Sequence, residues 1–339
     1  MTSLVQGSPE PLASRHDVGL LDLDGVLYIG PDAVPGAPEA IADARRCGMR
    51  VAYVTNNAAR TPETVARHLT ALGIPADTDD VVTSAQAVAT LVAADLPAGS
   101  PVLVVGGEGL RAALAEHGLR PLAEASGAAA VVQGFSPDVG WRLLAEGTYA
   151  VTAGLPWYAS NLDATVPTPR GIAPGNGALV DVIAGVTGRR PVAAGKPERP
   201  LHDEAVRRTD ARDPLVVGDR LDTDIEGAHR AGVPSLLVLT GVARPLDLLL
   251  APVPWRPTYV AEGLSDGLLQ AHPGVHPDGD GRWSCGGWSA VRGDGQLQLD
   301  GAGDRLDGLR ALCAAAWAGG PGAAPSQSAA AAQLARLGW

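Results

Sequence analysis

An apolar strand leads directly into a group of carboxylates at residues 216–224, which read VVGDRLDTD. Asp219, Asp222 and Asp224 place like charges close together, which is costly unless a cation neutralises them. A hard divalent ion with oxygen ligands removes that cost, and Mg²⁺ is usually bound by a few carboxylates together with phosphate. The segment therefore predicts a buried strand that ends at a magnesium site. A capping aspartate with solvated neighbours is the structural alternative.

Similar short apolar runs recur along the chain and alternate with helical patterns. Besides residues 214–218, they occupy residues 18–23, 50–55 and 101–106. Between the second and third runs in chain order, Val65, Leu69 and Leu72 recur at helical spacing after Thr61 and Pro62, which predict the start of a helix. Alternation of this kind is typical of a parallel sheet with crossover helices. We therefore predict an α/β fold with a doubly wound parallel-sheet core.

Two aspartates end the first of these strands. Asp22 and Asp24 lie in the sequence LDLDG, residues 21–25. Side chains two apart in a strand point to the same side, and open α/β sheets bind ligands at the carboxyl ends of their strands. Gly25 then permits a sharp turn. Both carboxylates can therefore face one site, although a solvated acidic turn would look the same in sequence.

Two further motifs supply groups that suit a phosphate. Thr55, Asn56 and Asn57 end the next strand, where a hydroxyl and backbone amides can form an anion cradle. Lys196 stands between Gly195 and Pro197, and a fixed point cation there can neutralise phosphate oxygens. Taken singly, the first motif is also a common turn and the second a common exposed loop.

The domain organisation follows from an insertion. Residues 84–190 contain strands and helices of their own, and they separate residues 15–83 from residues 191–270. We expect the two outer segments to form the core and the inserted α/β segment to form a second domain. Residues 275–339 are expected to form a small α+β extension of unknown role.

The extension carries no chemical motif. It is rich in Gly, Asp and Trp and ends in an Ala-rich stretch. Residues 288–291 and 296–299, joined by a turn at residues 292–295, predict a β-hairpin, and residues 306–317 predict a helix. On this basis the chain from about residue 273 onward is expected to be dispensable for chemistry.

Composition limits the partners. The chain has 339 residues, a net charge of −11 and a pI near 5.0, without a block of Lys or Arg, which argues against nucleic acid and anionic membranes. Three cysteines without paired spacing argue against a disulfide framework. The first residues lack a leader pattern, and no run approaches a membrane span. A cytoplasmic protein is expected.

The four motifs, taken together in this order, resemble those of the haloacid dehalogenase superfamily of phosphohydrolases. The resemblance covers about residues 17–270. Between Asp22 and Thr55 there is no room for a first-type cap, whereas the insertion before Lys196 is similar to the large second-type cap of class IIA. Residues 159–163 (ASNLD) and 174–177 (PGNG) are also similar to that branch.

The resemblance implies a covalent mechanism. Asp22 attacks phosphorus and forms an aspartyl phosphate, a route open to carboxylates. Asp24 protonates the leaving oxygen and later activates water. Thr55, Asn56 and Lys196 bind the phosphoryl group, because catalysis of its transfer is mostly positioning and charge stabilisation.

The resemblance also implies a magnesium cofactor. Its ligands are the carboxylates of Asp22 and Asp219 and the backbone carbonyl of Asp24, with Asp224 supporting the site.

The leaving group is less determined by the sequence. The branch includes phosphatases of glycerol phosphate, phosphoglycolate, pyridoxal phosphate and nitrophenyl phosphate. Asn161 and Asp163 form the most distinctive polar loop of the insertion, and a carboxylate there accepts hydrogen bonds from hydroxyls but repels a second carboxylate. The alternatives are that Asp163 only supports its loop, or that Arg170 offsets its charge. We expect a small phosphorylated metabolite, glycerol 3-phosphate first, with phosphoglycolate and pyridoxal phosphate as alternatives; a homo-oligomer is possible.

Two other classes share parts of the pattern. Residues 107–112 (GEGLRA) follow an apolar strand and fit a dinucleotide-binding turn, but Glu124 is poorly placed as the acidic residue such a unit needs. A phosphorelay receiver also uses Asp, Thr and Lys around Mg²⁺. Receivers are much shorter, and their acceptor Asp lies on a middle strand rather than the first.

Overall fold

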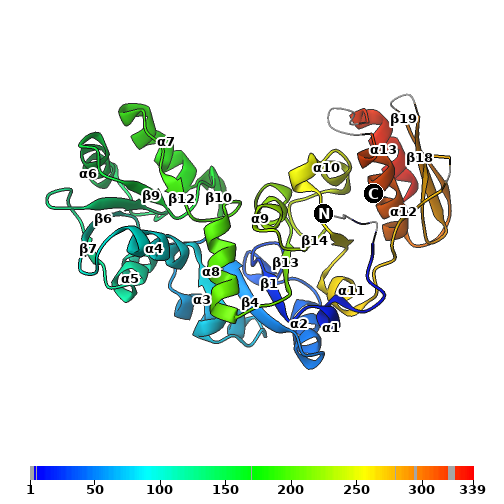
Figure 1. Cartoon of the computed structure of the whole chain (residues 1–339), viewed down its shortest axis with the longest axis horizontal. Coiled ribbons are helices and arrows are strands. Elements are labelled where there is room, and N and C mark those ends of the chain that lie inside the picture. Colours follow the sequence, from blue (N-terminus) through cyan, green and yellow to red (C-terminus); the bar gives the residue numbers. More distant parts are fainter. Residues whose placement is uncertain (1–3, 5, 169, 279, 294–295, 320–324) are drawn as a thin grey trace. The chain divides into compact units, whose positions relative to one another are not determined.

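The computed structural model describes residues 4, 6–168, 170–278, 280–293, 296–319 and 325–339 (Figure 1). The chain divides into two compact units, Met1–Val51 with Ala211–Trp339, and Ala52–Asp210. These boundaries are not those expected from the sequence, and the division into a core and an inserted domain at residues 84 and 190 stays a prediction. Strands and helices alternate in both units, so the predicted α/β class with parallel sheets is confirmed.

The first unit contains four parallel strands in the order β15-β14-β13-β1. Nearly all of their residues are buried, which explains why the sequence shows short continuous apolar runs rather than alternation. Their bounds are β1 Val18–Leu21, β13 Pro214–Gly218, β14 Ser235–Val238 and β15 Tyr259–Ala261. The predicted strands at residues 18–23 and 214–218 are confirmed, the first ending at Leu21.

Short helices and one small hairpin complete this part of the unit. Helix α2 begins after Gly36 with a proline in its first turn, and it buries Ala40, Ile41 and Ala44 on one face. It packs against α11. The bounds are α1 Leu12–Arg15, β2 Tyr28–Ile29, β3 Asp32–Ala33, α2 Ala37–Arg46, a π-helical turn Leu221–Ile225, α9 Glu226–Ala231, α10 Pro245–Leu249, a 3₁₀ turn Val253–Trp255 and α11 Leu264–Leu269.

The C-terminal extension folds as an antiparallel sheet with two helices. The sheet order is β16-β17-β18-β19, with β16 His276–Pro277, β17 Arg282–Cys285, β18 Trp288–Gly293 and β19 Gln296–Gly301. The helices are α12 Arg305–Trp317 and α13 Gln327–Arg336. The predicted hairpin strands and helix are confirmed, while residues 294–295 of the predicted turn lie outside the described residues.

The extension shares a hydrophobic core with the parallel sheet. Leu309 and Leu312 of α12 belong to the same buried cluster as Leu248 of α10, Leu237 of β14 and Val260 of β15. Helix α12 contacts α10 and β15. The extension is therefore part of the packing of its unit, so its removal is expected to affect folding, while its dispensability for chemistry stays a prediction.

The second unit contains a five-stranded parallel sheet in the order β12-β9-β8-β6-β7. Helices α6 and α7 cover one of its faces and α4 and α5 the other (Figure 1). The strands are β6 Pro101–Val105, β7 Arg120–Leu122, β8 Ala130–Gln133, β9 Trp157–Ala159 and β12 Val192–Ala193, and the helices are α4 Ser84–Asp95, α5 Glu108–Glu116, α6 Trp141–Thr152 and α7 Asn176–Thr187.

The same unit holds the end of strand β4, Arg50–Thr55, as predicted, paired in parallel with β5, Val81–Thr83. It also contains α3 Pro62–Ala71, a 3₁₀ turn Thr78–Asp80, the antiparallel pair β10 Thr165–Thr168 and β11 Gly171–Pro174, and α8 Arg199–Thr209. Pro62 stands in the first turn of α3, where its missing N–H costs nothing. The start predicted from Thr61 and Pro62 is confirmed.

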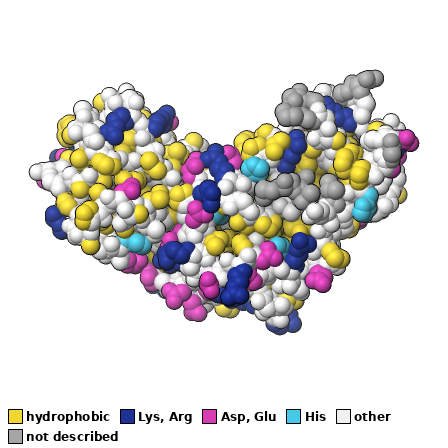
Figure 2. All heavy atoms as spheres, in the orientation of Figure 1, with side chains coloured by type: hydrophobic (Ala, Val, Ile, Leu, Met, Phe, Trp, Pro, Cys, Tyr) yellow, Lys and Arg dark blue, Asp and Glu magenta, His cyan; other side chains and the backbone are white. Residues whose placement is uncertain are grey.

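The surface charges are dispersed on the face drawn in Figure 2. Lys and Arg side chains lie scattered among Asp and Glu, without forming a continuous basic patch on the described part of that face. Among the residues that the structure describes, no helix has both the length and the apolar character needed to cross a membrane.

Candidate active site

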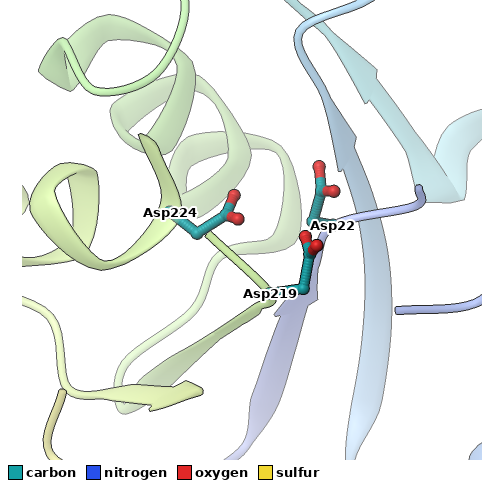
Figure 3. Close-up of side chains that lie close together, drawn as sticks. All are labelled: Asp22, Asp219 and Asp224. Carbon is teal, nitrogen blue, oxygen red and sulfur yellow. The ribbon is translucent and has the colours of Figure 1, made fainter. Parts of the chain in front are cut away.

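Three aspartates of the first unit converge at the carboxyl edge of its parallel strands. One carboxylate oxygen from each of Asp22, Asp219 and Asp224 lies within 4.8 Å of the others, and Figure 3 shows the side chains of Asp219 and Asp224 directed toward Asp22. Asp219 and Asp224 are each 1% exposed. Within the described residues, no other group of three possible metal ligands is found.

The pairing of β1 with β13 explains this convergence. Leu21 lies opposite Val217, and the Asp22 N–H donates to the Val217 carbonyl at 2.8 Å. Both strands are parallel, so the residues that follow them leave the sheet at the same edge. Asp22 and Asp219 are therefore brought together by the register of two adjacent strands.

Backbone N–H groups and glycines surround Asp219. The Val242 N–H donates to Asp219 Oδ2 at 2.7 Å, and the Ala243 N–H donates to the Asp219 carbonyl at 2.9 Å. A Cβ atom added at Gly25 or Gly241 would stand 2.4 or 2.0 Å from Asp219 Oδ2. Gly25 also has a φ of +81°, which favours glycine. These glycines allow two loops to close around the carboxylate.

Asp224 is held against the end of its own strand. The Arg220 N–H donates to Asp224 Oδ2 at 3.1 Å, and a Cβ at Gly218 would stand 2.2 Å from the Asp224 Cβ. Asp222, in contrast, forms an ion pair with Arg220 at 2.9 Å and lies outside the carboxylate group. Of the three aspartates in the motif, two therefore face the site.

Asp24 occupies the turn after Asp22. Its side chain is exposed, and the Tyr28 hydroxyl lies 3.5 Å from Asp24 Oδ2. The turn is fixed by the Gly25 N–H, which donates to the Tyr28 carbonyl at 2.8 Å, and by the Thr240 hydroxyl, which donates to the Gly25 carbonyl at 2.6 Å. An exposed carboxyl in a fixed turn can exchange protons with water, as a general acid and base requires.

The three carboxylates fit a hard cation. Their oxygens are the ligand type that Mg²⁺ prefers, and two of the three are taken out of bulk water with like charges at short distance. The structure brings together Asp22 and Asp219, the two predicted carboxylate ligands. Asp224, which was predicted only to support the site, lies within the same 4.8 Å. The Asp24 carboxylate is not a member of this cluster, and the ligand role of its backbone carbonyl stays a prediction.

A second group of predicted residues gathers within the second unit. Asn56 contacts both Lys196 and Asp163 through hydrogen bonds, and Asn161 donates to the Asn56 carbonyl at 2.8 Å. Thr55 is buried, and its Oγ1 accepts from the Asn57 N–H at 3.0 Å. The residues predicted for phosphate binding and those predicted for substrate recognition are thus neighbours in this unit.

Lys196 is almost completely buried. It is 4% exposed, and its Nζ donates to the Val54 carbonyl at 3.2 Å. His202 of α8 is also buried, and its burial together with the positive charge of Lys196 lowers the pKa of His202 to about 3. His202 is therefore neutral near pH 7 and adds no second positive charge beside the lysine.

The glycine-rich turn at residues 107–112 has a packing role. A Cβ at Gly109 would stand 2.7 Å from the carbonyl oxygens of both Ala58 and Arg60. The first turn of α5 therefore lies directly against the backbone that follows the Thr-Asn-Asn motif. This contact explains the glycine without a dinucleotide, whose phosphates would need the same helix terminus.

Parallel strands with acidic side chains converging at their carboxyl edge are the arrangement expected of a metal-dependent α/β enzyme of phosphoryl transfer. Comparison with known proteins agrees. A family model described as haloacid dehalogenase-like hydrolase matches residues 19–120, and a related model described as HAD-hydrolase-like matches residues 193–267. A third, a GCN5-related N-acetyltransferase like domain, matches residues 285–339.

Characterised relatives match over most of the chain. D-glycerol 3-phosphate phosphatase of Mycobacterium tuberculosis is 44% identical, over 90% of this chain and 87% of the relative. Acid sugar phosphatase of Staphylococcus saprophyticus is 36% identical, over 73% and 95%. The chain belongs to the haloacid dehalogenase-like hydrolases, as the order of its motifs predicted.

Solved structures show the same likeness. The glycerol phosphate phosphatase of Mycobacterium tuberculosis in complex with magnesium has a TM-score of 0.87 and 42% identity, covering 97% of this chain and 99% of that one. The p-nitrophenyl phosphatase from Archaeoglobus fulgidus has a TM-score of 0.70 and 27% identity, covering 75% and 98%. The likeness of the extension to an acetyltransferase-like domain was not predicted, because that segment contains no chemical motif.

Proposed function

We propose that this chain hydrolyses a small polyol phosphate, with glycerol 3-phosphate as its substrate, through an aspartyl phosphate on Asp22. The enzyme is a phosphoric monoester hydrolase, and Mg²⁺ is its cofactor. The observation that carries the proposal is the approach of Asp22, Asp219 and Asp224 to within 4.8 Å at the end of the parallel strands. The expected partner is a small phosphorylated metabolite. The cytoplasmic location of the enzyme and its assembly into a homo-oligomer stay predictions.

Each aspartate has a role in the proposed reaction. Asp22 attacks phosphorus and carries the phosphoryl group covalently. Asp24 donates a proton to the leaving alcohol and then takes one from the water that hydrolyses the aspartyl phosphate. Asp22, Asp219 and the Asp24 carbonyl would hold Mg²⁺, with Asp224 beside them; the bound ion supplies charge neutralisation for attack on an anionic ester.

We propose that Thr55 and Lys196 bind the phosphoryl oxygens. The burial of Lys196 favours this role, because a charge removed from water interacts more strongly with an anion. The neighbouring His202 is neutral, so of these two residues only Lys196 carries a positive charge.

Removal of the metal is expected to abolish activity. In excess EDTA the chain should lose turnover of nitrophenyl phosphate, and added Mg²⁺ should restore it, because the three carboxylates otherwise oppose binding of an anion. Asp219→Ala should raise the Mg²⁺ concentration needed for half-maximal activity by about tenfold or more. The matched control is Asp222→Ala, whose carboxylate pairs with Arg220 outside the group. Full activity in EDTA contradicts the metal role.

The substrate proposal rests on a charge argument and on the relatives. Asp163 is partly exposed, and a carboxylate there disfavours a substrate with a second carboxylate, such as phosphoglycolate. Of the relatives named above, the mycobacterial enzyme acts, by its name, on glycerol 3-phosphate, which is a polyol phosphate. A hydroxyl-rich leaving group satisfies both observations.

Relative specificity is expected to favour glycerol 3-phosphate. At one Mg²⁺ concentration, its kcat/KM should exceed those of phosphoglycolate and pyridoxal phosphate by about tenfold or more, a difference of about 1.4 kcal/mol in transition-state binding. Asp163→Asn should narrow the gap to phosphoglycolate, because it removes the repelling charge. A tenfold lead of either alternative in the unmodified enzyme disproves the polyol proposal.

A further inference from the structure

The side chain of Asn56 clamps the backbone of Lys196. Its Oδ1 accepts from the Lys196 N–H at 2.8 Å, and its Nδ2 donates to the Lys196 carbonyl at 3.1 Å. Nδ2 also lies 3.2 and 3.1 Å from the two carboxylate oxygens of Asp163. An Asn side chain has one carbonyl oxygen and two N–H groups, so both ends of this amide are already engaged by protein.

The backbone of Asn56 is held as well. Its carbonyl accepts from the Ser84 hydroxyl at 2.6 Å and from Asn161 Nδ2 at 2.8 Å. Asn161 in turn accepts the Asp163 N–H at 3.1 Å through its Oδ1, and its carbonyl accepts from Asn176 Nδ2 at 2.7 Å. Ser84, Asn161 and Asn176 are buried, so these bonds are shielded from water.

Gly195 shows how closely the segments approach. A Cβ at this position would stand 2.6 Å from Asn56 Oδ1, 2.5 Å from the Ser160 carbonyl and 2.9 Å from the Asn161 Cβ. Only a glycine leaves room for the Asn56 amide between the lysine loop and the loop of residues 160–163. The clamp is therefore a packed arrangement of three segments and not a surface contact.

We propose that Asn56 is a positioning residue that aligns Lys196 and couples it to the polar loop at residues 161–163. The inference rests on the proposed phosphate-binding role of Lys196. The phosphate-binding role predicted for Asn56 is then left to its backbone N–H, because its side-chain amide is bonded to the lysine backbone and to Asp163. Misplacement of a charged group by about 1 Å can cost about a hundredfold in rate, so a clamp on the lysine backbone is expected to act on turnover.

The coupling gives Asp163 a second role. Its carboxylate accepts from the amide that also holds Lys196, so movement of the loop on substrate binding is transmitted to the lysine backbone through one side chain. Recognition of the leaving group and alignment of the phosphate-binding cation then depend on one another. A substrate whose leaving group is poorly recognised is therefore expected to show a lower kcat as well as weaker binding.

The test is a double-mutant cycle in the full-length enzyme with Mg²⁺ and glycerol 3-phosphate. Asn56→Ala is expected to lower kcat by about a hundredfold with little change in KM and in the Mg²⁺ requirement. Lys196→Ala should lose at least as much, and Asn56→Ala added to Lys196→Ala should cost nothing further, because Asn56 acts through the lysine. Losses that multiply overturn the inference and leave the role of Lys196 intact.

A matched control is available in the extension. Gln298 Nε2 donates to Asp300 Oδ2 at 3.0 Å, an exposed amide and carboxylate pair outside the site, so Gln298→Ala should keep kcat. If Asn56→Ala does not fold, Asn56→Asp, which retains the acceptor for the Lys196 N–H but loses both donors, enters the same cycle. A KM effect alone overturns the inference, and full kcat in Lys196→Ala overturns it together with the proposed role of the lysine.

Discussion

Replacing Asp22 with Asn is expected to abolish turnover without unfolding the protein. Asn is nearly the same size but cannot form the acyl phosphate by the same route, so kcat should fall by about 10⁴-fold or more, as for other nucleophiles that act within a unit. The Asp22 N–H bond to the Val217 carbonyl comes from the backbone and survives the change. The measurement is kcat for glycerol 3-phosphate, together with the melting temperature.

Two readouts separate a nucleophile from a mere metal ligand. Rapid acid quench should trap a phosphorylated chain in the unmodified enzyme and none in Asp22→Asn, whereas Asp219→Ala in high Mg²⁺ should still form it. In EDTA, Asp22→Asn should melt no lower than the unmodified chain, because one of three neighbouring charges is gone. Retention of more than about a tenth of kcat rules out Asp22 as the nucleophile.

The cluster of three aspartates could be predicted because its members follow strands that the sequence pattern indicates. The run before Asp22 and the run before Asp219 are short, continuous and apolar, and both are buried strands. Parallel strands then bring their carboxyl ends to one edge without further information. What the sequence left open was the division among Asp219, Asp222 and Asp224, since only the local turn and the Arg220 pair direct Asp222 away.

The Asn56 clamp could not be predicted in the same way. Its partners, Lys196 and Asp163, are 140 and 107 positions away in sequence. No periodicity connects them, and an Asn after a strand is common in ordinary turns. A direct phosphate contact was therefore the natural prediction for Asn56, and only the three-dimensional contacts suggest a different role.

The sequence of the extension contains a packing pattern although it lacks chemical motifs. Helix α12 is buried around nearly its whole circumference, with residues 308–317 all buried. A helix without a polar face indicates burial on more than one side, and the run from Leu309 to Trp317 shows this in sequence. The extension therefore lacks chemical motifs but carries a strong packing pattern, which indicates that the fold of its unit depends on it.

Deletion of residues 273–339 is expected to leave a chain that does not fold. The deletion uncovers Leu248 and Leu249 of α10, which are 0% and 1% exposed and lie in one core with Leu309 and Leu312. Burial of each large apolar side chain contributes about 1.5–3 kcal/mol, so losing several is comparable with the total stability of about 5–15 kcal/mol of an ordinary domain. Circular dichroism and chromatography of the truncated chain give the measurement.

The same packing connects the extension to the metal site. Ala243 belongs to the shared core, and its N–H holds the Asp219 carbonyl at 2.9 Å. A milder change, Leu312→Ala, should cost about 2–5 kcal/mol by leaving a cavity under α10. It should also raise the Mg²⁺ concentration that the enzyme needs, because the loop around Asp219 loses its support.

The requirement is not common to the whole family. The archaeal p-nitrophenyl phosphatase is covered over 98% of its length by 75% of this chain, so the family fold does not itself need such an extension. Here, however, Arg310 is buried and donates to the Val260 carbonyl at 3.0 Å, and the apolar face of α10 has α12 and α13 as its cover. Gln298→Ala on the exposed face of β19 is the control for Leu312→Ala. A chain ending at residue 272 with the melting temperature and kcat of the full-length enzyme would show that the shared core is not needed.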